Sequence, residues 1–487
     1  MKEGRFDLII IGAGSGGIGA AIAAGRLGLK VLLLEKNSRL GGNAAVSGVS
    51  VWEMGAGGTG IPFDIYRRMK KERDAIGIYS FNRHCAWKNE NGTSQFPPGA
   101  DLTIDPTLRY LDSLRRFGAR SLKEDELFVR KYWHGVPFEP GIYQNMVKKW
   151  LDQMPDVTVR TSETYSDVAY SDSRIEELTL TNGEKVSAPF YIDSTDSAYL
   201  VQSCGREMLF GQESRHRFDE PGAPETPSRF VNGVSLIFRI RPTERRRVEE
   251  LPGGIGKDCW WRDAFPLASM VQYPNGDYNV NMLPTMDGQE YMEWDPKTVY
   301  QECKNRSLAY WHYLQTEFPE FQSYKRVGEF LSLGVRETHR IVAEYILTEL
   351  DVTTGLNGQK HPDIIAIADH PMDVHGGDNP GCRELSSPYG IPFRCLIPEG
   401  MENVLVASRA GGFSSIAASS CRLSRTMMQL GQAAGTAAYV ALDSGRSFQD
   451  LDIPKLQDLL EDQHVQLSWP MPGRIRKHIG KERCDSE

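Results

Sequence analysis

Short aliphatic runs and a glycine- and alanine-rich stretch alternate over the first 36 residues. Residues 6–11 and 31–34 are mostly β-branched or aliphatic, which predicts two fully buried parallel strands. Residues 16–27 lie between them, and their small side chains predict a closely packed helix that ends at Gly28 in a left-handed cap. A strand, a helix and a second strand in this order predict the opening of a doubly wound α/β sheet.

The hydrophobic pattern further along the chain predicts a mixture of helices and short strands. Helical periodicity covers residues 64–73, 106–118 and 141–154, and strand-like runs cover residues 156–160, 168–170, 176–181 and 190–193. Between 207 and 395 the pattern changes to antiparallel signals, with strands predicted at 234–241, 270–273 and 278–283. A long helix is predicted over 297–318, with Asp295 as its N-cap and Pro296 at its first position.

These changes of pattern predict how the chain divides. We expect a three-layer, Rossmann-like nucleotide-binding domain with an inserted α+β substrate or cap domain. The nucleotide domain would be discontinuous, formed by residues 1–75, 140–206 and 395–445. Residues 76–139 would be a surface or cap excursion, 207–394 the inserted substrate domain, and 446–487 a peripheral helical tail.

Composition excludes several classes of protein. Of the 487 residues, 40% are hydrophobic and 25% are charged, a globular balance that excludes disorder, collagen and coiled coil. The net charge of −8 disfavours nucleic acid as a partner. The eight cysteines are scattered with no CxxC pair, so we expect no metal. The chain has no stretch of 18 apolar residues and no room for a signal peptide before its first strand, so we expect no membrane span and a cytoplasmic protein.

A dinucleotide-binding fingerprint follows the first predicted strand. Residues 12–17 fit G-x-G-x-x-G, in which Gly12 allows a tight turn, Gly14 allows the backbone to approach a pyrophosphate, and Gly17 allows close packing of helix on strand. The pyrophosphate would rest on the helix N-terminus. Glu35 ends the second strand, where a carboxylate accepts hydrogen bonds from the ribose hydroxyls. The alternative is a packing turn that binds no ligand.

A second glycine pair, Gly41 and Gly42, favours FAD over NAD. It follows the ribose acid closely and would let the chain run beside the far half of a cofactor larger than NAD. Lys36, which follows Glu35, and Asn43, which follows Gly42, are further candidate cofactor contacts. The alternative is a simple turn after a strand. Residues 55–60 also match the fingerprint, but no aliphatic strand precedes them, and a loop is the preferred interpretation.

The far end of the chain supplies further candidate contacts. A predicted strand at 404–407 runs into a loop at Arg409, and an alanine- and glycine-rich helix follows near 420–442, with Arg422 at its start. The positive end of such a helix, aimed at a flavin pyrimidine edge, would stabilise the negative charge that appears on reduction. The alternative is a helix that serves packing alone.

These motifs together resemble the FAD-dependent oxidoreductase family, whose relatives include the flavin subunit of heterodisulfide reductase. The resemblance spans residues 6–442 and rests on these segments: 12–17, Glu35, 41–42, 191–196, 334–338, 403–409 and 431–438. It implies FAD as cofactor, with Asp193, Arg409 and Arg422 among its contacts. In that family the segment at 191–196 usually reads I-D-A-T-G-D, whereas this chain has Ser194 in place of alanine and lacks the glycine. The iron–sulfur cysteines of the heterodisulfide reductases are missing, so electron bifurcation is not implied.

The catalytic candidates come from segments shortly before the chain returns to the nucleotide domain. Because a flavin carries out the hydride transfer, the protein must orient the substrate and provide an acid or base. His375 is the preferred acid–base in a predicted irregular loop at 368–377, because Asp373 precedes it and two glycines follow it. His370 comes second and His339 third. A loop histidine that is only solvated or capping is the alternative.

Arg336 is the candidate that binds a substrate anion. If its segment is helical, Arg336 and Arg340 share a face, which is unfavourable unless an anion lies between them. The alternative is that Glu337 and Glu344 pair with these arginines.

The sequence therefore predicts an FAD-dependent oxidoreductase that transfers hydride between a small polar substrate and the flavin N5. One rival is an NAD-dependent dehydrogenase or isomerase, which a visible flavin spectrum would exclude. Another is a non-enzymatic flavin-binding protein, which photoreduction followed by an acceptor screen would distinguish. The bond that is oxidised and the second electron partner are left open.

Overall fold

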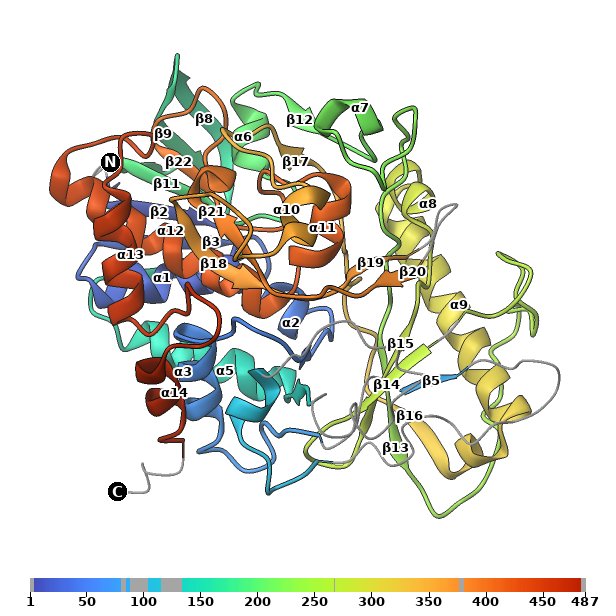
Figure 1. Ribbon diagram of the computed structural model, residues 1–487. Coiled ribbons are helices and arrows are strands. Elements are labelled where there is room, and N and C mark those ends of the chain that lie inside the picture. The colour runs from blue at the N-terminus through green and yellow to red at the C-terminus, as the bar shows by residue number, and fades with distance from the viewer. Residues whose placement is uncertain are drawn as a thin grey trace.

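A five-stranded parallel sheet forms the centre of the larger part of the molecule (Figure 1). The computed structural model describes residues 4–79, 85–87, 104–114, 134–266, 268–375 and 381–482. The strands of the sheet lie in the order β22 (Val404–Val406), β11 (Phe190–Asp193), β2 (Leu8–Ile11), β3 (Val31–Glu35) and β7 (Val157–Thr161). Because all pair in parallel, their carboxyl ends meet at one edge of the sheet, where ligands of doubly wound folds bind.

Strand β2 shows why this domain has three layers. Leu8 and Ile10 belong to a core cluster with α1 (Ser15–Arg26) and α12 (Ser424–Ser444). Ile9 and Ile11 face the opposite way and pack with side chains of a second sheet. That sheet is four-stranded, in the order β1 (Gly4–Arg5), β10 (Lys185–Ser187), β9 (Arg174–Leu180) and β8 (Tyr165–Ser171). The three-layer, doubly wound fold class is thus confirmed.

Small residues bring α1 and α12 into backbone contact. A β-carbon at Gly431 would lie 1.9 Å from the carbonyl oxygen of Gly16, and one at Gly435 would lie 2.4 Å from that of Ala20. Both helices are therefore held at a separation that larger side chains would not permit. The predicted packing of a thin C-terminal helix on the first βαβ unit is confirmed, and this pair fixes the start of α12 relative to the fingerprint loop.

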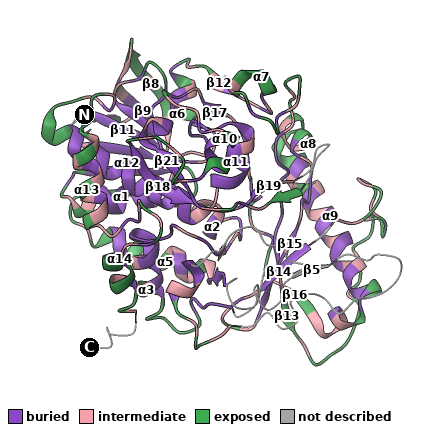
Figure 2. Cartoon of the chain, in the orientation of Figure 1, coloured by how far each residue is buried: buried purple, intermediate pink, exposed green. Residues whose placement is uncertain are grey.

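A separate antiparallel sheet of five strands forms the smaller part of the molecule. Its order is β16 (Tyr324–Val327), β13 (Phe238–Pro242), β15 (Tyr278–Met282), β14 (Ala268–Gln272) and β5 (Cys85–Trp87). The helix α9 (Pro296–Glu317) packs on it, with Asp295 accepting hydrogen bonds from the Lys297 and Thr298 amides as the predicted N-cap. Buried side chains of this sheet and of α9 form a core cluster of their own, within the interior coloured purple in Figure 2.

The described residues from 341 to 375 and from 381 to 397 pack differently from the antiparallel sheet. Ile365, Tyr389 and Ile391 belong to the cluster around α1 and α12, although they come from the same predicted insertion. They bring the segment that carries the catalytic candidates alongside the nucleotide domain. The division of the chain at the predicted boundaries stays a prediction.

The remaining elements connect and cover these layers. The helices are α2 (Gly42–Ala45), α3 (Ile61–Met69), α5 (Pro140–Asp152), α6 (Tyr199–Ser203), α7 (Arg215–Phe218), α8 (Gly288–Glu293), α10 (Glu349–Thr354), α11 (Ser415–Cys421), α13 (Ile453–Asp462), α14 (Gly473–Ile479) and the 3₁₀ turns η1 (Tyr110–Leu114), η2 (Pro319–Ser323) and η3 (Phe393–Leu396). The short strands are β4 (Val51–Trp52), β6 (Val136–Pro137), β12 (Met208–Leu209), β17 (Arg340–Ile341), β18 (Ile364–Ala368), β19 (Met372–Val374), β20 (Gly381–Arg383) and β21 (Tyr389–Pro392). No helix among the described ranges is long and apolar enough to cross a membrane.

Three local predictions were wrong in ways that bear on the site. The helix near 420–442 is broken at Arg422, which lets α12 begin a new N-terminus. The loop at 368–377 contains β19, which pairs with β20, while Gly376 and Gly377 lie outside the described residues. The segment from Arg336 to Arg340 is not helical, because Arg340 enters β17 and pairs with β12.

The helix predicted over 106–118 contains the 3₁₀ turn η1, and residues 115–118 lie outside the described part of the chain. The strand predicted over 234–241 begins only at Phe238, since Val234 and Ser235 form isolated bridges to Met286 and Gly334.

Candidate active site

A cavity of about 1220 Å³ lies between the parallel sheet and the antiparallel sheet. Its lining begins at the fingerprint loop and Glu35, passes the first turn of α12, and reaches β14 and β15 of the five-stranded antiparallel sheet. It includes the catalytic candidates Arg336, His370 and His375. One cavity thus joins the predicted dinucleotide site to the predicted reaction site.

The fingerprint loop forms an open cradle at the N-terminus of α1. Gly12 has a φ of 92°, and a β-carbon there would lie 2.8 Å from the Ser194 carbonyl oxygen. Gly14 is the N-cap of α1, lines the cavity and has no side-chain cap. A β-carbon on Gly14 would have no neighbour closer than 4.0 Å, so its backbone is open to a ligand. Gly17 does not line the cavity, since its β-carbon would meet the Gly12 carbonyl oxygen at 1.9 Å.

Glu35 lies at the end of β3 with its carboxylate fixed beside this loop. Its Oε2 accepts a hydrogen bond of 2.8 Å from the Ala13 amide, and its Oε1 accepts one of 2.9 Å from the Asn37 amide. The side chain is 6% exposed and lines the cavity, so its remaining acceptor positions can face a ligand there. Lys36 also lines the cavity, and its Nζ lies 5.5 Å from the centre of the Tyr199 ring.

The second glycine pair brings another stretch of backbone against the cradle. Gly41 and Gly42 have φ values of 104° and 49°, and a β-carbon on Gly42 would lie 3.0 Å from the Gly14 Cα. Gly42 and Asn43 line the cavity, whereas Gly41 does not. The Asn43 Nδ2 donates a hydrogen bond of 2.8 Å to the Val335 carbonyl oxygen. Asn43 therefore ties the cradle to the segment that carries Arg336.

Asp193 is fully buried and does not line the cavity. Its Oδ1 accepts hydrogen bonds from the amide and hydroxyl of Thr195, and its Oδ2 accepts one of 2.7 Å from the Leu200 amide. Burial raises the pKa of Asp193, although these hydrogen bonds oppose the shift. Asp193 shapes the turn after β11, and its neighbours Ser194, Thr195 and Asp196 line the cavity instead.

The first turn of α12 faces the cavity. Residues 423–427 belong to the lining, and the N-cap residue Leu423 offers no side-chain hydrogen bond. The amides at this end and the positive end of the helix dipole favour a negatively charged ligand group. Only the break at Arg422 gives α12 an N-terminus at this point.

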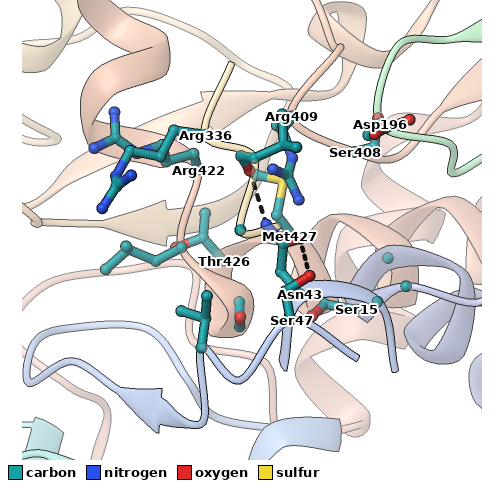
Figure 3. A pocket seen from close by; sticks show the side chains of 18 of the residues that line it. Ser15, Asn43, Ser47, Asp196, Arg336, Ser408, Arg409, Arg422, Thr426 and Met427 are labelled. Atoms are coloured by element: carbon teal, nitrogen blue, oxygen red, sulfur yellow. Dashed lines mark hydrogen bonds between the residues drawn. The ribbon is translucent and has the colours of Figure 1, made fainter. Parts of the chain in front are cut away.

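Three arginines gather at the cavity beyond α12, as Figure 3 shows. Arg336 donates from Nη1 to the Gly233 carbonyl oxygen at 2.7 Å. Arg422 donates from Nη2 to the Asp373 carbonyl oxygen at 2.9 Å. Burial, and then the charge of Arg422, lower the pKa of Arg336 to about 9. Burial also lowers the pKa of Arg409, whose neighbours are Asp196 and Arg422.

His375 lies beside these arginines and pairs with Asp373. The His375 Nε2 is 2.7 Å from the Asp373 Oδ2. Burial, and then Arg336, lower the pKa of His375 to about 4 against the pull of Asp373, so the ring is neutral at pH 7. Burial opposes ionisation of Asp373, but the hydrogen bond from His375 and the nearby positive charges hold its pKa below the ordinary value. The Nε2 hydrogen is therefore donated to Asp373, and the Nδ1 lone pair can accept a proton.

His370 also lines the cavity but is held differently. Its Nδ1 lies 2.8 Å from the Pro371 carbonyl oxygen, and its own carbonyl accepts a hydrogen bond of 2.5 Å from Ser420. The structure thus brings His370, His375 and Arg336 to one cavity.

Arg340 does not line the cavity that holds Arg336, His370 and His375. It is fully buried and forms ion pairs with Glu337 and, at 2.6 Å, with Glu213. The pairing of Arg340 with Glu337, which the sequence left as an alternative, is what the structure shows. Glu337 also accepts hydrogen bonds of 3.0 and 2.7 Å from the amide and side chain of Asn232.

Asn232 holds the backbone of His375, a contact that sequence reasoning missed. The Asn232 Oδ1 accepts a hydrogen bond of 2.9 Å from the His375 amide, and the Gly233 amide donates one of 3.0 Å to the His375 carbonyl oxygen. The partners are separated by 143 positions along the chain, and no local pattern signals such a contact. The polar floor of the cavity on β14 and β15, formed by Ser269, Asn279 and Asn281, was missed for the same reason.

Comparison with known proteins identifies the family of this chain. A family model described as "FAD dependent oxidoreductase" matches residues 7–460. The chain belongs to this family. This membership confirms the expected cofactor, FAD, and the expected enzyme class, an FAD-dependent oxidoreductase.

Curated relatives match only a short stretch of the chain. A 3-oxosteroid 1-dehydrogenase of Comamonas testosteroni is 44% identical over 52 residues, which are 11% of this chain and 9% of the relative. A 4-oxocyclohexanecarboxylate 2-dehydrogenase of Sinomonas cyclohexanicum is 45% identical over 47 residues, 10% and 8% of the two chains. The chain thus spans about a tenth of the length of the curated relatives it matches.

Solved structures match over much more of the chain at low identity. The flavin-dependent brominase Bmp2 is 13% identical, with 94% of this chain and 84% of that chain covered at a TM-score of 0.46. The p-nitrophenol 4-monooxygenase PnpA of Pseudomonas putida is 11% identical, with 99% and 94% covered at a TM-score of 0.41.

Proposed function

We propose that this FAD-dependent oxidoreductase transfers a hydride between a small polar substrate and the flavin N5, with His375 as the acid or base. The observation that carries the proposal is the pair formed by the neutral His375 ring and the Asp373 carboxylate, which lies in the same cavity as the dinucleotide cradle. Both curated relatives are named as dehydrogenases, which supports the reaction type.

The cradle residues would hold the adenosine and pyrophosphate portions of FAD. The α1 N-terminus at Gly14 favours the pyrophosphate, and Glu35 would accept hydrogen bonds from the ribose hydroxyls. Gly42 and Asn43 would lie along the cofactor beyond the ribose. Gly17, Gly41 and Asp193 would act by shaping the loops. Arg409, which lines the cavity, would face the cofactor's middle portion.

Bound at this site, the flavin supplies the hydride acceptor or donor. The α12 N-terminus would stabilise negative charge on the flavin ring. His375 Nδ1 would take a proton from the substrate as the hydride leaves it, or return one in the opposite direction. Asp373 keeps the proton of His375 on Nε2 and stabilises the charged ring that follows proton uptake.

Backbone contacts hold His375 in place for this role. Asn232 and Gly233 fix the His375 main chain from both sides, and the buried ion pairs of Arg340 anchor Asn232 through Glu337. Such support would hold an acid–base within the tolerance that proton transfer requires.

Anaerobic mixing of the FAD-loaded protein with sugars, amino acids and 2-hydroxy acids tests this proposal. We expect the visible flavin absorbance to bleach with at least one class of donor, and the bleaching to slow in His375→Ala. Photoreduced protein screened against electron acceptors tests the reverse direction. A protein that retains FAD but exchanges hydride with no tested donor or acceptor would contradict the proposal.

A further inference from the structure

Arg422 carries a buried nitrogen that bonds to nothing in the described part of the chain. Its side chain is 8% exposed and lines the cavity. Nη2 reaches the carbonyl oxygen of Asp373 at 2.9 Å and its Oδ2 at 3.4 Å. Nη1 is buried and has no hydrogen-bond partner among the described residues. A buried donor on a charged group is costly to leave unpaired, so this nitrogen marks a position where a ligand acceptor belongs.

Arg336 presents a second guanidinium to the same place. Its Nη1 donates hydrogen bonds to two uncharged acceptors, the Gly233 carbonyl oxygen at 2.7 Å and the Ser235 hydroxyl at 3.0 Å. Burial, and then the charge of Arg422, lower the pKa of Arg336. Two cations held together in a closed site are stabilised by an anion between them.

The carboxylate that contacts Arg422, Asp373, already has a partner in His375. Asp373 forms a hydrogen bond with His375 and pairs with Arg422 through a single oxygen. Arg409 adds a third positive charge from the side of Asp196. The cavity lining also includes the carboxylates Asp369 and Glu384, and a buried Asn281 Oδ1 that accepts no hydrogen bond from the described residues. The gathering of Arg336, Arg409 and Arg422 favours an anion at their own part of the cavity.

The position of the pair separates it from the cradle. In Figure 3, Arg336 and Arg422 lie together, and Ser15, Asn43 and Ser47 lie on the other side of Met427. His375 shares Asp373 with Arg422, so an anion at this pair lies next to the acid–base. The arrangement assigns Arg422 to the substrate, although the sequence placed it among the cofactor contacts.

We infer that Arg336 and Arg422 together bind a carboxylate of the substrate, so that the substrate is a small organic acid whose reacting carbon lies beside His375. Guanidinium groups bind the planar carboxylate through paired hydrogen bonds, and the orphaned Nη1 of Arg422 would supply one of them. The inference deepens the proposed function and rests on it for the place of the reacting carbon.

Binding of malonate to the FAD-loaded protein tests the inference. Titration calorimetry and the shift of the visible flavin spectrum should both show saturable binding of malonate and much weaker binding of malonamide, its uncharged analogue. Inorganic phosphate serves as a third ligand, because it offers the same charge with a tetrahedral shape. We expect malonate to bind more tightly than phosphate.

Variants connect this binding to the two arginines. Arg422→Met and Arg336→Met should each weaken malonate binding ~10-fold or more, the cost of losing a charged hydrogen bond. Arg422→Lys should restore part of the affinity, since it keeps the charge without the planar fork. Arg217→Met is the matched control, because Arg217 is 45% exposed and pairs with Glu207. Its malonate affinity should equal that of the wild type.

Three results would overturn the inference: equal affinity for malonate and malonamide, tighter binding of phosphate than of malonate, or unchanged malonate affinity in both arginine variants. If neither variant folds with FAD, the comparison of the three ligands on the wild type still decides. A protein that binds malonate through these arginines but exchanges hydride with no tested partner would contradict the proposed function and leave the anion site standing.

Discussion

The two ends of the cavity are assembled from very different stretches of chain. The cradle end is formed largely by residues 12–43, within one βαβ unit and the turn that follows it. The reaction end combines residues 232–235, 336, 370–375 and 422, which the fold brings together over long sequence distances. A cofactor site based on backbone geometry can be encoded locally, whereas a site of charged side chains here depends on tertiary packing.

Removal of the proposed acid–base should give the largest difference between the two ends of the cavity, because it should slow flavin reduction without loss of FAD. His375→Ala should slow substrate-dependent flavin reduction by ~10² to 10⁴, the usual contribution of a positioned proton acceptor. FAD content and thermal stability should stay near those of the wild type. Stopped-flow absorbance at the flavin bands measures the rate.

His216→Ala is the control for that change, because His216 has a side chain that is 78% exposed and lies outside the cavity lining. Equal reduction rates in His375→Ala and the wild type would move the role to His370 or His339.

At the cradle end, we expect a substitution to weaken FAD binding and to leave the reduction rate of the FAD-loaded protein largely intact. Glu35→Ala should weaken FAD binding by about 1.5 to 3 kcal/mol, the value of charged hydrogen bonds to the ribose, and the protein should purify largely without flavin. Reconstituted with excess FAD, the variant should recover most of its reduction rate. Glu329→Ala, an exposed site, is the control. Full retention of FAD by Glu35→Ala after dialysis would contradict the assignment.

The helix pair that supports the cradle should be sensitive to a single methyl group. Gly431→Ala would place a β-carbon 1.9 Å from the Gly16 carbonyl oxygen, so α12 must shift. We expect a loss of about 1 to 3 kcal/mol in the free energy of unfolding. Chemical denaturation of the FAD-loaded protein measures it. Gly473→Ala, where a β-carbon meets nothing within 4 Å, should change stability far less.

The smallest expected effect concerns how the flavin reduction rate depends on pH. Since burial and Arg336 lower the pKa of His375 to about 4, the base stays neutral, and the reduction rate should hold as pH falls until that pKa is reached. Arg336→Met removes a neighbouring positive charge, so the acid limb should move upward toward 6.5, the unperturbed value. A rate profile measured between pH 4 and 8 in both proteins checks this sign. An acid limb at the same pH in both would mean that another group controls it.

The sequence predicts the cradle well because its signals are local. The strand–turn–helix order and the aliphatic runs on either side of α1 define the fold class before any contact is known. The same reasoning failed at Arg422 and Arg336, where it expected a continuous helix and a shared helical face. There the arginine side chains bond to the carbonyl oxygens of Asp373 and Gly233, more than 45 positions away along the chain.

Candidate residues show the same division. The residue types at 336, 370 and 375 were enough to nominate them, since arginine and histidine carry anion binding and proton transfer. The pairing of Arg340 with the nearby Glu337 was open as an alternative, but nothing local indicates that Asn232 holds His375 or that Glu213 also pairs with Arg340. Those roles depend on which loops the two sheets bring together.

A crystal structure of the FAD-loaded protein with malonate tests the central claim most directly. The account predicts adenosine at Glu35, the flavin ring at the first turn of α12, and malonate between Arg336 and Arg422, next to His375. Flavin in direct contact with Arg422 that leaves no room for malonate, or an adenosine placed away from Glu35, would contradict it.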